Sequence, residues 1–266
     1  MFDSIAGDYD ALNHILSLDV DKFWRKKALK QIVDAPAPAR VLDLACGTGD
    51  FSIAIAKALS RSHKRVGTPI EAHVKAPAKA PVEAQVTSTG FVTGDSGRSD
   101  LMTKGHVTGV DLSEGMLAVM REKVAKAGLT EMISIEEGDG ENLRFPDNTF
   151  DRVTIAFGIR NFENREKGLR EMLRVLKPGG RLVILELSRP ENKVIRWFYD
   201  LYFLHILPKI GGKVSGDKAA YAYLPASVAA FPGKKAFMAT MREAGFRTVT
   251  HKAFTLGICR MYTGEK

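Results

Sequence analysis

An arginine and an asparagine stand side by side in the motif FGIRNF, directly after a run of apolar residues that favours a β-strand. Arg160 carries a fixed positive charge, whereas Asn161 can both donate and accept hydrogen bonds. One interpretation is a polar loop in which Arg160 pairs with a structural carboxylate. The other is a pair that meets a substrate, because a cation lowers the pKa of a nearby hydroxyl group and an amide can fix its orientation. The rest of the chain must decide between them.

Three further polar or glycine-containing turns follow apolar runs. Gly47 and Gly49 form a G-x-G turn that lets the backbone approach a ligand, but Ser52 stands where a dinucleotide fingerprint needs a third glycine. Asp111 can accept hydrogen bonds from the two hydroxyl groups of a ribose, and Asp139 from an adenine amino group. Each acid alone is equally well explained as a helix cap or a loop carboxylate. In this order they indicate an adenosine pocket, and the missing phosphate loop favours S-adenosylmethionine (SAM) over NAD.

The elements that position these residues alternate between apolar strands and amphipathic helices. Strands that are apolar throughout, joined by helices, predict an α/β fold with a parallel sheet covered on both faces. The predicted strands are RVLDLACGTG, HVTGVDLS, ISIEEGD, FDRVTIAF and RLVILELS, and the predicted helices are DFSIAIAKAL, EGMLAVMREKVAKAG and REKGLREMLRVLKPGG. The C-terminal TVTHKAFTLGICRMYTGEK is expected to close the sheet with the last strands.

Residues 61–104 interrupt this alternation of strands and helices. They are rich in Ala, Pro, Lys, Gly, Ser and Thr and have no sustained period, which is typical of a disordered insertion. The insertion joins the end of a helix to the start of a strand, so it should lie at the amino ends of the parallel strands. Ligands bind outside the carboxyl ends, and the insertion is therefore expected to be dispensable for chemistry.

Composition excludes several classes of protein. The chain of 266 residues has a net charge of +8, of which residues 60–106 supply +3, with seven Lys and Arg against four Asp and Glu. The remaining +5 is spread along the chain without aromatic residues inside a basic run, so we expect no nucleic-acid partner. Cys46 and Cys259 lack disulfide or metal-ligand spacing, and no metal is expected. With no apolar span and no signal peptide at its start, the chain is expected in the cytoplasm.

The stretches VLDLACGTGD, GVDLSEGML, GDGENLRFPDNTFD and EMLRVLKPGGRLVILELSRP resemble the motifs of class I SAM-dependent methyltransferases. More narrowly, MFDSIAGDYDALNHILSLDVDKFWRKKAL, FGIRNF and YAYLPASVAAFPGKKAF resemble the C-methyltransferases of quinone biosynthesis. The chain departs from the family pattern at Asp21, where a histidine is usual, at Gly140, where alanine is usual, and at Arg144, where proline is usual. The resemblance implies a Rossmann-like fold with a mostly parallel seven-stranded sheet and helices on both faces. It further implies one domain over 1–266, with an N-terminal helical lid over 1–39 and a substrate-side flap over 190–235.

The resemblance also implies roles for individual residues. The catalytic residues it implies are Arg160, Asn161 and Tyr9. The residues it implies for cofactor binding are Asp43, Gly47, Thr48, Gly49, Asp111, Leu112, Met116, Asp139 and Gly140. Those it implies for substrate binding are Phe157, Arg160, Asn161, Tyr221 and Tyr223. The group that removes the ring proton stays open among Tyr9, Asp10, His14, Glu186, Ser188, Tyr221 and Tyr223.

The implied reaction is SAM-dependent C-methylation of demethylmenaquinol to menaquinol. Aromatic carbon is a poor nucleophile unless an adjacent hydroxyl ionises, and a reduced quinone has such hydroxyls. The alternatives are the equivalent methylation of the ubiquinone-precursor benzoquinol, or both reactions, or methylation of another small molecule. A non-enzymatic alternative is that the chain is a SAM-binding regulator or scaffold. The partner is a prenylated quinol, and peripheral contact with the inner membrane surface and a homo-oligomer stay open.

Residues 193–212 form an apolar stretch directly after the fifth predicted strand. Its apolar positions nearly encircle a helix, which on composition favours a buried core helix. The alternative is a flap that admits a prenyl tail or touches a bilayer, assisted by Lys193, Arg196 and Lys209. Both interpretations are compatible if different faces of the helix serve each role.

Overall fold

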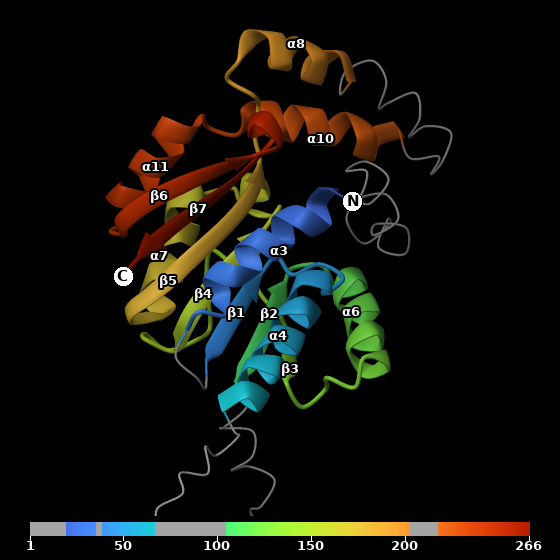
Figure 1. The fold of residues 1–266 in the computed structure, drawn as a ribbon, viewed down its shortest axis with the longest axis vertical. Helices are drawn as coiled ribbons and strands as arrows, with labels where there is room; N and C mark the ends of the chain where they lie inside the picture. The colour runs from blue at the N-terminus through green and yellow to red at the C-terminus, as the bar shows by residue number, and fades with distance from the viewer. Residues whose placement is uncertain (1–19, 36–38, 67–104, 203–217) are drawn as a thin grey trace, which may run out of the picture.

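The structure is a computed structural model that describes residues 20–35, 39–66, 105–202 and 218–266. Its centre is a seven-stranded sheet in the order β3-β2-β1-β4-β5-β7-β6 (Figure 1). The five strands β1 to β5 run parallel to one another, and β7 pairs antiparallel with both β5 and β6. The strands are β1 (Arg40–Leu44), β2 (His106–Asp111), β3 (Ile133–Glu137), β4 (Phe150–Ala156), β5 (Leu176–Leu187), β6 (Arg247–Phe254) and β7 (Cys259–Glu265).

Helices cover both faces of the sheet (Figure 1). One face carries α3 (Val20–Ile32), α4 (Asp50–Val66) and α6 (Glu114–Lys126), and the other carries α7 (Arg165–Val175) and α11 (Lys234–Glu243). Helices α8 (Lys193–Leu201) and α10 (Lys218–Ala230) follow the carboxyl end of β5. The 3-10 helices are η1 (Ile159–Asn161) and η3 (Thr255–Gly257). This arrangement confirms the predicted α/β fold with a mostly parallel sheet, and the C-terminal segment forms its last two strands.

Strand alternation divides the core into two layers. Val41 faces the layer built with α3, α4 and α6, whereas Leu42 and Leu44 face the layer built with α7 and α11. Successive side chains of a strand point to opposite faces, so one apolar strand serves both layers. The sheet is therefore fixed from both sides, and the loops at its carboxyl edge stand on a rigid base.

One predicted boundary is wrong. The helix expected over 165–180 ends at Val175, and the strand β5 already begins at Leu176. Pro178 cannot continue the helical hydrogen bonds, and Gly179 adopts a positive φ of 74°. The pairing of β4 with β5 is irregular between Phe150 and Arg152, which accommodates this turn within the strand.

Helix α8 also differs from the interpretation that composition favours. Val194, Trp197 and Phe198 are 65%, 61% and 60% exposed, and Leu201 on the same face is also exposed. Tyr199 on the opposite face is buried and packs with Val228 of α10. The helix is therefore amphipathic, and the core interpretation is wrong for this described part of residues 193–212.

The insertion lies mostly outside the described residues. Helix α4 continues to Val66, six residues into the expected low-complexity segment, and the rest of it (67–104) is not described. The chain returns at Gly105, immediately before the amino end of β2. No helix in the described part of the chain is long and apolar enough to cross a membrane.

Candidate functional site

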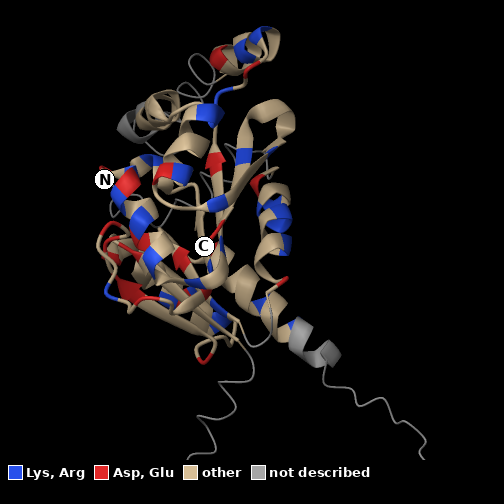
Figure 2. Ribbon diagram, turned by 90° about the vertical axis from the view of Figure 1, so that its left-hand side faces the viewer, with Lys and Arg blue, Asp and Glu red and all other residues tan. Residues whose placement is uncertain are grey.

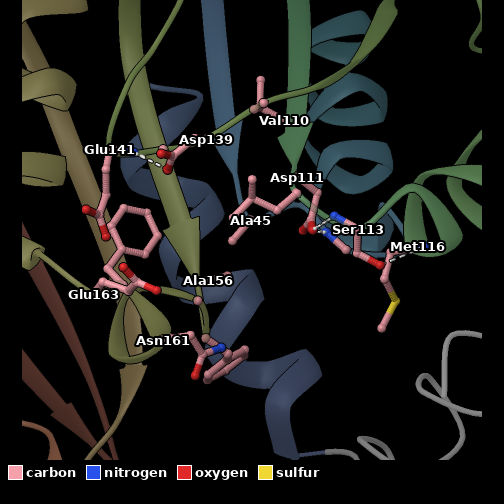
Figure 3. Close-up of a pocket in the computed structure, with 17 residues that line it drawn as sticks. Ala45, Val110, Asp111, Ser113, Met116, Asp139, Glu141, Ala156, Asn161 and Glu163 are labelled. Carbon is pink, nitrogen blue, oxygen red and sulfur yellow. Dashed lines mark hydrogen bonds between the residues drawn. The ribbon is translucent and has the colours of Figure 1, made fainter. Parts of the chain in front are cut away.

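The carboxyl ends of β1, β2, β3 and β4 surround a pocket of about 480 Å³. Figure 3 shows Asp111 and Ser113 on one side of this pocket and Glu141 and Glu163 on the other. The pocket lies where the strand order reverses between β1 and β4, and α/β sheets bind ligands at such switch points. Its lining residues are Ala45, Gly47, Val110, Asp111, Leu112, Ser113, Met116, Gly138, Asp139, Gly140, Glu141, Ala156, Phe157, Gly158, Asn161, Phe162 and Glu163.

The carboxylate of Asp111 holds two turns together at the end of β2. Its Oδ2 accepts a hydrogen bond from the Gly47 backbone N–H at 2.8 Å, and its Oδ1 accepts one from Ser113 at 2.9 Å. Gly47 has a positive φ of 55°, which glycine adopts without the steric cost of a side chain. The acid thereby fixes the glycine turn and the start of α6, and its own position at the wall of the pocket is fixed by the same two bonds.

Asp139 follows β3 by two residues and caps its own loop. Its Oδ1 accepts a hydrogen bond from the Glu141 backbone N–H at 2.8 Å. Beside it, a Cβ added at Gly140 would lie 2.5 Å from the ring of Phe162. The same ring lies equally close to the Cβ position of Gly168, so it fills the space between two glycines. The absence of a side chain at Gly140 is therefore matched by Phe162.

Arg160 does not line the pocket. Its Nη1 donates to Glu186 Oε1 at 2.8 Å and to the carbonyl of Phe157, and its Nε donates to Ser227 at 3.3 Å. Glu186 lies in β5 with a fully buried side chain and also accepts a hydrogen bond from the Arg160 backbone N–H. The structure therefore has the carboxylate pairing that the sequence left open, and this buried ion pair fixes η1 against β5.

Asn161 does line the pocket, and a tyrosine orients it. The hydroxyl of Tyr223 on α10 donates to Asn161 Oδ1 at 2.9 Å. With its oxygen engaged, the amide presents its NH2 group as a donor. Phe157 adopts a positive φ of 63°, an uncommon conformation for a bulky residue that tends to occur at functional sites. This turn brings η1 and Asn161 over the end of β4.

A smaller hollow of about 40 Å³ adjoins the main pocket and shares Ala45, Gly47, Ala156 and Phe157 with it. Asp43 and Thr48 line the smaller hollow. Burial raises the pKa of Asp43 from 3.8 to about 7, although Ser52 donates a 2.5 Å hydrogen bond to its Oδ2. This carboxyl group can therefore gain or lose a proton near neutral pH.

Most predicted cofactor residues meet at these two connected hollows: Gly47, Asp111, Leu112, Met116, Asp139 and Gly140 at the larger, and Asp43, Gly47 and Thr48 at the smaller. Gly49 lines neither hollow. A Cβ at this position would collide with the side chain of Met120, so the glycine allows close packing of the turn against α6. Of the substrate-binding predictions, Phe157 and Asn161 line the pocket and Tyr223 supports Asn161. Tyr9, Asp10, His14 and the side chain of Tyr221 lie outside the described residues.

Sequence reasoning missed Ser113, Phe162 and Arg25. Ser113 precedes a helical pattern as an N-cap and could have been noticed; its side chain accepts a hydrogen bond from Met116 N. Phe162 ends the motif FGIRNF, and Arg25 lies in the N-terminal stretch that resembles the family, but their places at the hollows depend on packing between elements far apart in the sequence. Among the described residues, no group of three or more His, Cys, Asp or Glu is placed to hold a metal ion.

Comparison with solved structures shows the fold. A SAM-dependent methyltransferase from Aquifex aeolicus is 19% identical with a TM-score of 0.54, and the match covers 90% of this chain and 88% of that one. The [4+2]-cyclase SpnF is 16% identical with a TM-score of 0.59, over 91% of this chain and 80% of that one. The class I methyltransferase fold expected from the motifs is confirmed, and SpnF illustrates that one fold hosts different chemistries.

Comparison with curated proteins extends over the whole chain. The "Ubiquinone/menaquinone biosynthesis C-methyltransferase UbiE" of Geobacter sulfurreducens is 44% identical over 100% of this chain and 87% of its own length. The "Demethylmenaquinone methyltransferase" enzymes of Deinococcus radiodurans and Bacteroides fragilis are 41% and 39% identical, each over 100% of this chain and 91% of the relative. The model of the ubiE/COQ5 methyltransferase family matches residues 1–266. The chain therefore belongs to the ubiE/COQ5 methyltransferase family, as the resemblance implied.

Proposed function

We propose that this methyltransferase transfers a methyl group from SAM to a ring carbon of a prenylated quinol, with demethylmenaquinol as its substrate. The observation that carries the proposal is that Gly47, Asp111, Asp139 and Asn161, which lie far apart in the sequence, line one pocket. SAM as the cofactor is borne out by the family match and by the fold. The names of the relatives from Deinococcus and Bacteroides support the naphthoquinol substrate.

The pocket fits SAM. Gly47 and Gly140 present backbone without side chains, and the Asp111 carboxylate is fixed in place as an acceptor suited to ribose hydroxyls. Asp139 is the acceptor for an adenine amino group, and Leu112 and Met116 supply apolar contact for the base. When bound, SAM supplies an electrophilic methyl group on a sulfonium. The residues of this chain bind and orient the two reactants and contribute chiefly through proximity and electrostatics.

Asn161 is the residue that faces the quinol. Because Tyr223 occupies its oxygen, its NH2 group is left to donate to a quinol oxygen, which stabilises the ionised form of that oxygen. The ionised hydroxyl then raises the electron density of the ring carbon that is methylated. Arg160 serves as a positioning residue: its charge is balanced by Glu186, and its bond to the Phe157 carbonyl holds the turn that presents Asn161.

Product analysis with two reduced quinones tests the substrate. We expect purified protein and SAM to convert a reduced short-tail demethylmenaquinone to menaquinone, with no product from the oxidised form, which lacks hydroxyl groups. The reduced benzoquinone precursor of ubiquinone is the second candidate, because the UbiE relative of Geobacter sulfurreducens is named for both pathways. Product from the benzoquinol alone would contradict the proposed substrate, whereas product from both would extend it.

The exposed face of α8 is a candidate membrane contact. Val194, Trp197, Phe198 and Leu201 recur at helical spacing on one exposed face, and the exposed Lys193 begins the helix. Aromatic and aliphatic side chains with flanking cations are typical of helices that lie in a bilayer interface. The substrate has a prenyl tail that partitions into lipid, so a peripheral contact would place the pocket near its source.

A further inference from the structure

The smaller hollow beside the main pocket has a distribution of charge that the family motifs do not explain. Arg25 is the single Lys or Arg among its described lining residues, and it comes from α3 rather than from the sheet edge. Asp43 and Asp50 line the same hollow. Asp50 is already paired with Lys123 of α6, which also donates to Thr48 at 3.3 Å. One cation and one buried carboxyl group therefore remain to meet a ligand there.

Arg25 is held in place from two sides. Its guanidinium carbon lies 5.5 Å from the centre of the Phe157 ring, and the same ring contacts Trp24 at a centroid distance of 6.1 Å. Its Nε lies 3.4 Å from Asp21 Oδ2, and that nitrogen is buried without a hydrogen-bond partner of good geometry in the described part of the chain. Its Nη atoms donate no hydrogen bond to any described residue, which leaves the two-pronged end of the guanidinium available.

Arginine is suited to carboxylates because two parallel N–H groups match the two oxygens. The hollow opens beside Gly47, where the G-x-G turn meets the main pocket. Asp43 lies in β1, the strand that leads into this turn, and its carboxyl group suits an ammonium group. A cation and a carboxyl group lining one small hollow match the two charges of a zwitterionic amino acid. SAM carries such a group at the end of its molecule away from the adenine.

We propose that Arg25 binds the α-carboxylate of SAM and that the N-terminal helix α3 thereby takes part in cofactor recognition. This inference rests on the proposed use of SAM and deepens it. Asp21, one of the three positions at which the chain departs from the family pattern, acquires a role: it lies beside Nε and orients Arg25 toward the hollow. Arg25 acts as a binding residue with no part in proton transfer.

Isothermal titration with SAM and with decarboxylated SAM, which lacks only the carboxylate, tests the inference. Wild type should bind SAM more tightly than the decarboxylated compound. Arg25→Ala should weaken SAM binding about 10- to 100-fold, the range for a charge-assisted hydrogen bond, while changing the affinity for decarboxylated SAM less than about twofold. Arg25→Lys should lie between them, because lysine keeps the charge but loses the paired donors.

Lys26→Ala is the matched control, since this exposed neighbour on α3 removes the same charge outside the hollow. It should leave both affinities unchanged. An equal loss for SAM and decarboxylated SAM in Arg25→Ala would show a structural role and overturn the inference, as would no loss at all. Asp111→Ala should weaken the binding of SAM and of decarboxylated SAM by the same factor. If wild type bound neither ligand, the proposed cofactor itself would be wrong, which is a different outcome from either result with Arg25.

Discussion

At the scale of single residues, the chemistry of the site depends on polar groups whose partners are fixed before any ligand arrives. Asp111 holds two backbone N–H groups, Asn161 accepts from Tyr223, and Arg160 is balanced by Glu186. Such prior hydrogen bonding holds each group in one orientation, which is the form of preorganisation that favours a transition state.

The bond from Tyr223 to Asn161 predicts a specific kinetic effect. Tyr223→Phe removes the hydroxyl that fixes the amide, so the amide can rotate and its donor is no longer aimed at the quinol. We expect kcat to fall about 2- to 12-fold, in keeping with one neutral hydrogen bond, with SAM affinity unchanged. Steady-state kinetics with calorimetry of SAM binding measures both. An unchanged kcat would show that the bond does not orient the amide.

Asp43 predicts a pH dependence of stability. Its pKa is raised to about 7 in the folded protein, so the folded state binds a proton between about pH 4 and pH 7 that the unfolded state has lost. Its contribution to stability is complete below the unfolded pKa and is lost as pH rises through the folded pKa. Compared with Asp43→Asn, wild type should lose on the order of 2–4 kcal/mol of unfolding free energy from pH 5 to pH 8. Urea unfolding at both pH values measures this free energy. An equal change in unfolding free energy from pH 5 to pH 8 in wild type and Asp43→Asn would contradict the prediction.

Gly140 predicts an overpacking effect. In Gly140→Ala the new methyl group would press on Phe162, which cannot retreat because Gly168 lies behind it. We expect a loss of about 1–3 kcal/mol in unfolding free energy, since a close-packed interior resists an added methyl group. Phe162→Leu should relieve the clash and recover part of the loss in the double variant. Denaturant unfolding of the four proteins measures this coupling, and strictly additive losses would refute it.

At the scale of elements, the strand ends could be predicted from sequence, because apolar runs followed by glycine or acid mark the carboxyl edge of a parallel sheet. Asp111 and Gly47 were located in this way. Composition could not fix which side of α8 faces its neighbours, since only the packing of Tyr199 onto α10 reveals the exposed side. It could not place Arg160 either: Glu186 is buried within β5, and its pairing with η1 spans two separate elements.

The exposed face of α8 predicts membrane binding. Trp197→Ser with Phe198→Ser removes two aromatic side chains that contact each other on the surface, at a centroid distance of 4.9 Å, and lie outside the pocket. We expect the double variant to lose at least about tenfold in its partition onto vesicles of phosphatidylcholine and phosphatidylglycerol, because burial of aromatic area drives interfacial binding. Co-sedimentation measures the partition. Equal sedimentation of both proteins would exclude this face, provided that SAM affinity is unchanged.

At the scale of the whole molecule, the order of elements and the family motifs were enough to predict the fold and the sheet edge that binds ligands. The net charge of +8 predicted less: along the described part of the chain, Figure 2 shows basic and acidic residues interspersed on the ribbon. The smaller hollow depends on α3 packing across the sheet edge, and a contact between distant segments leaves no pattern in the local sequence.

The position of the insertion predicts that catalysis does not need it. Val66 and Gly105 flank residues 67–104 at the amino edge of the sheet, opposite the pocket. We expect replacement of 67–104 by a short Gly-Ser linker to leave SAM affinity and kcat within about twofold of wild type, because loops at this edge do not reach the ligand edge. A large loss of SAM binding by a folded deletion variant would contradict this placement.

The position of the new methyl group on the product shows whether this pocket directs methyl transfer to carbon. Wild-type protein would be incubated with SAM carrying a ¹³C-labelled methyl group and reduced short-tail demethylmenaquinone, and the product analysed by NMR. We predict that the label appears as a methyl group bonded to the ring carbon. Label on a quinol oxygen, or no transfer by protein that binds SAM, would contradict the proposed function.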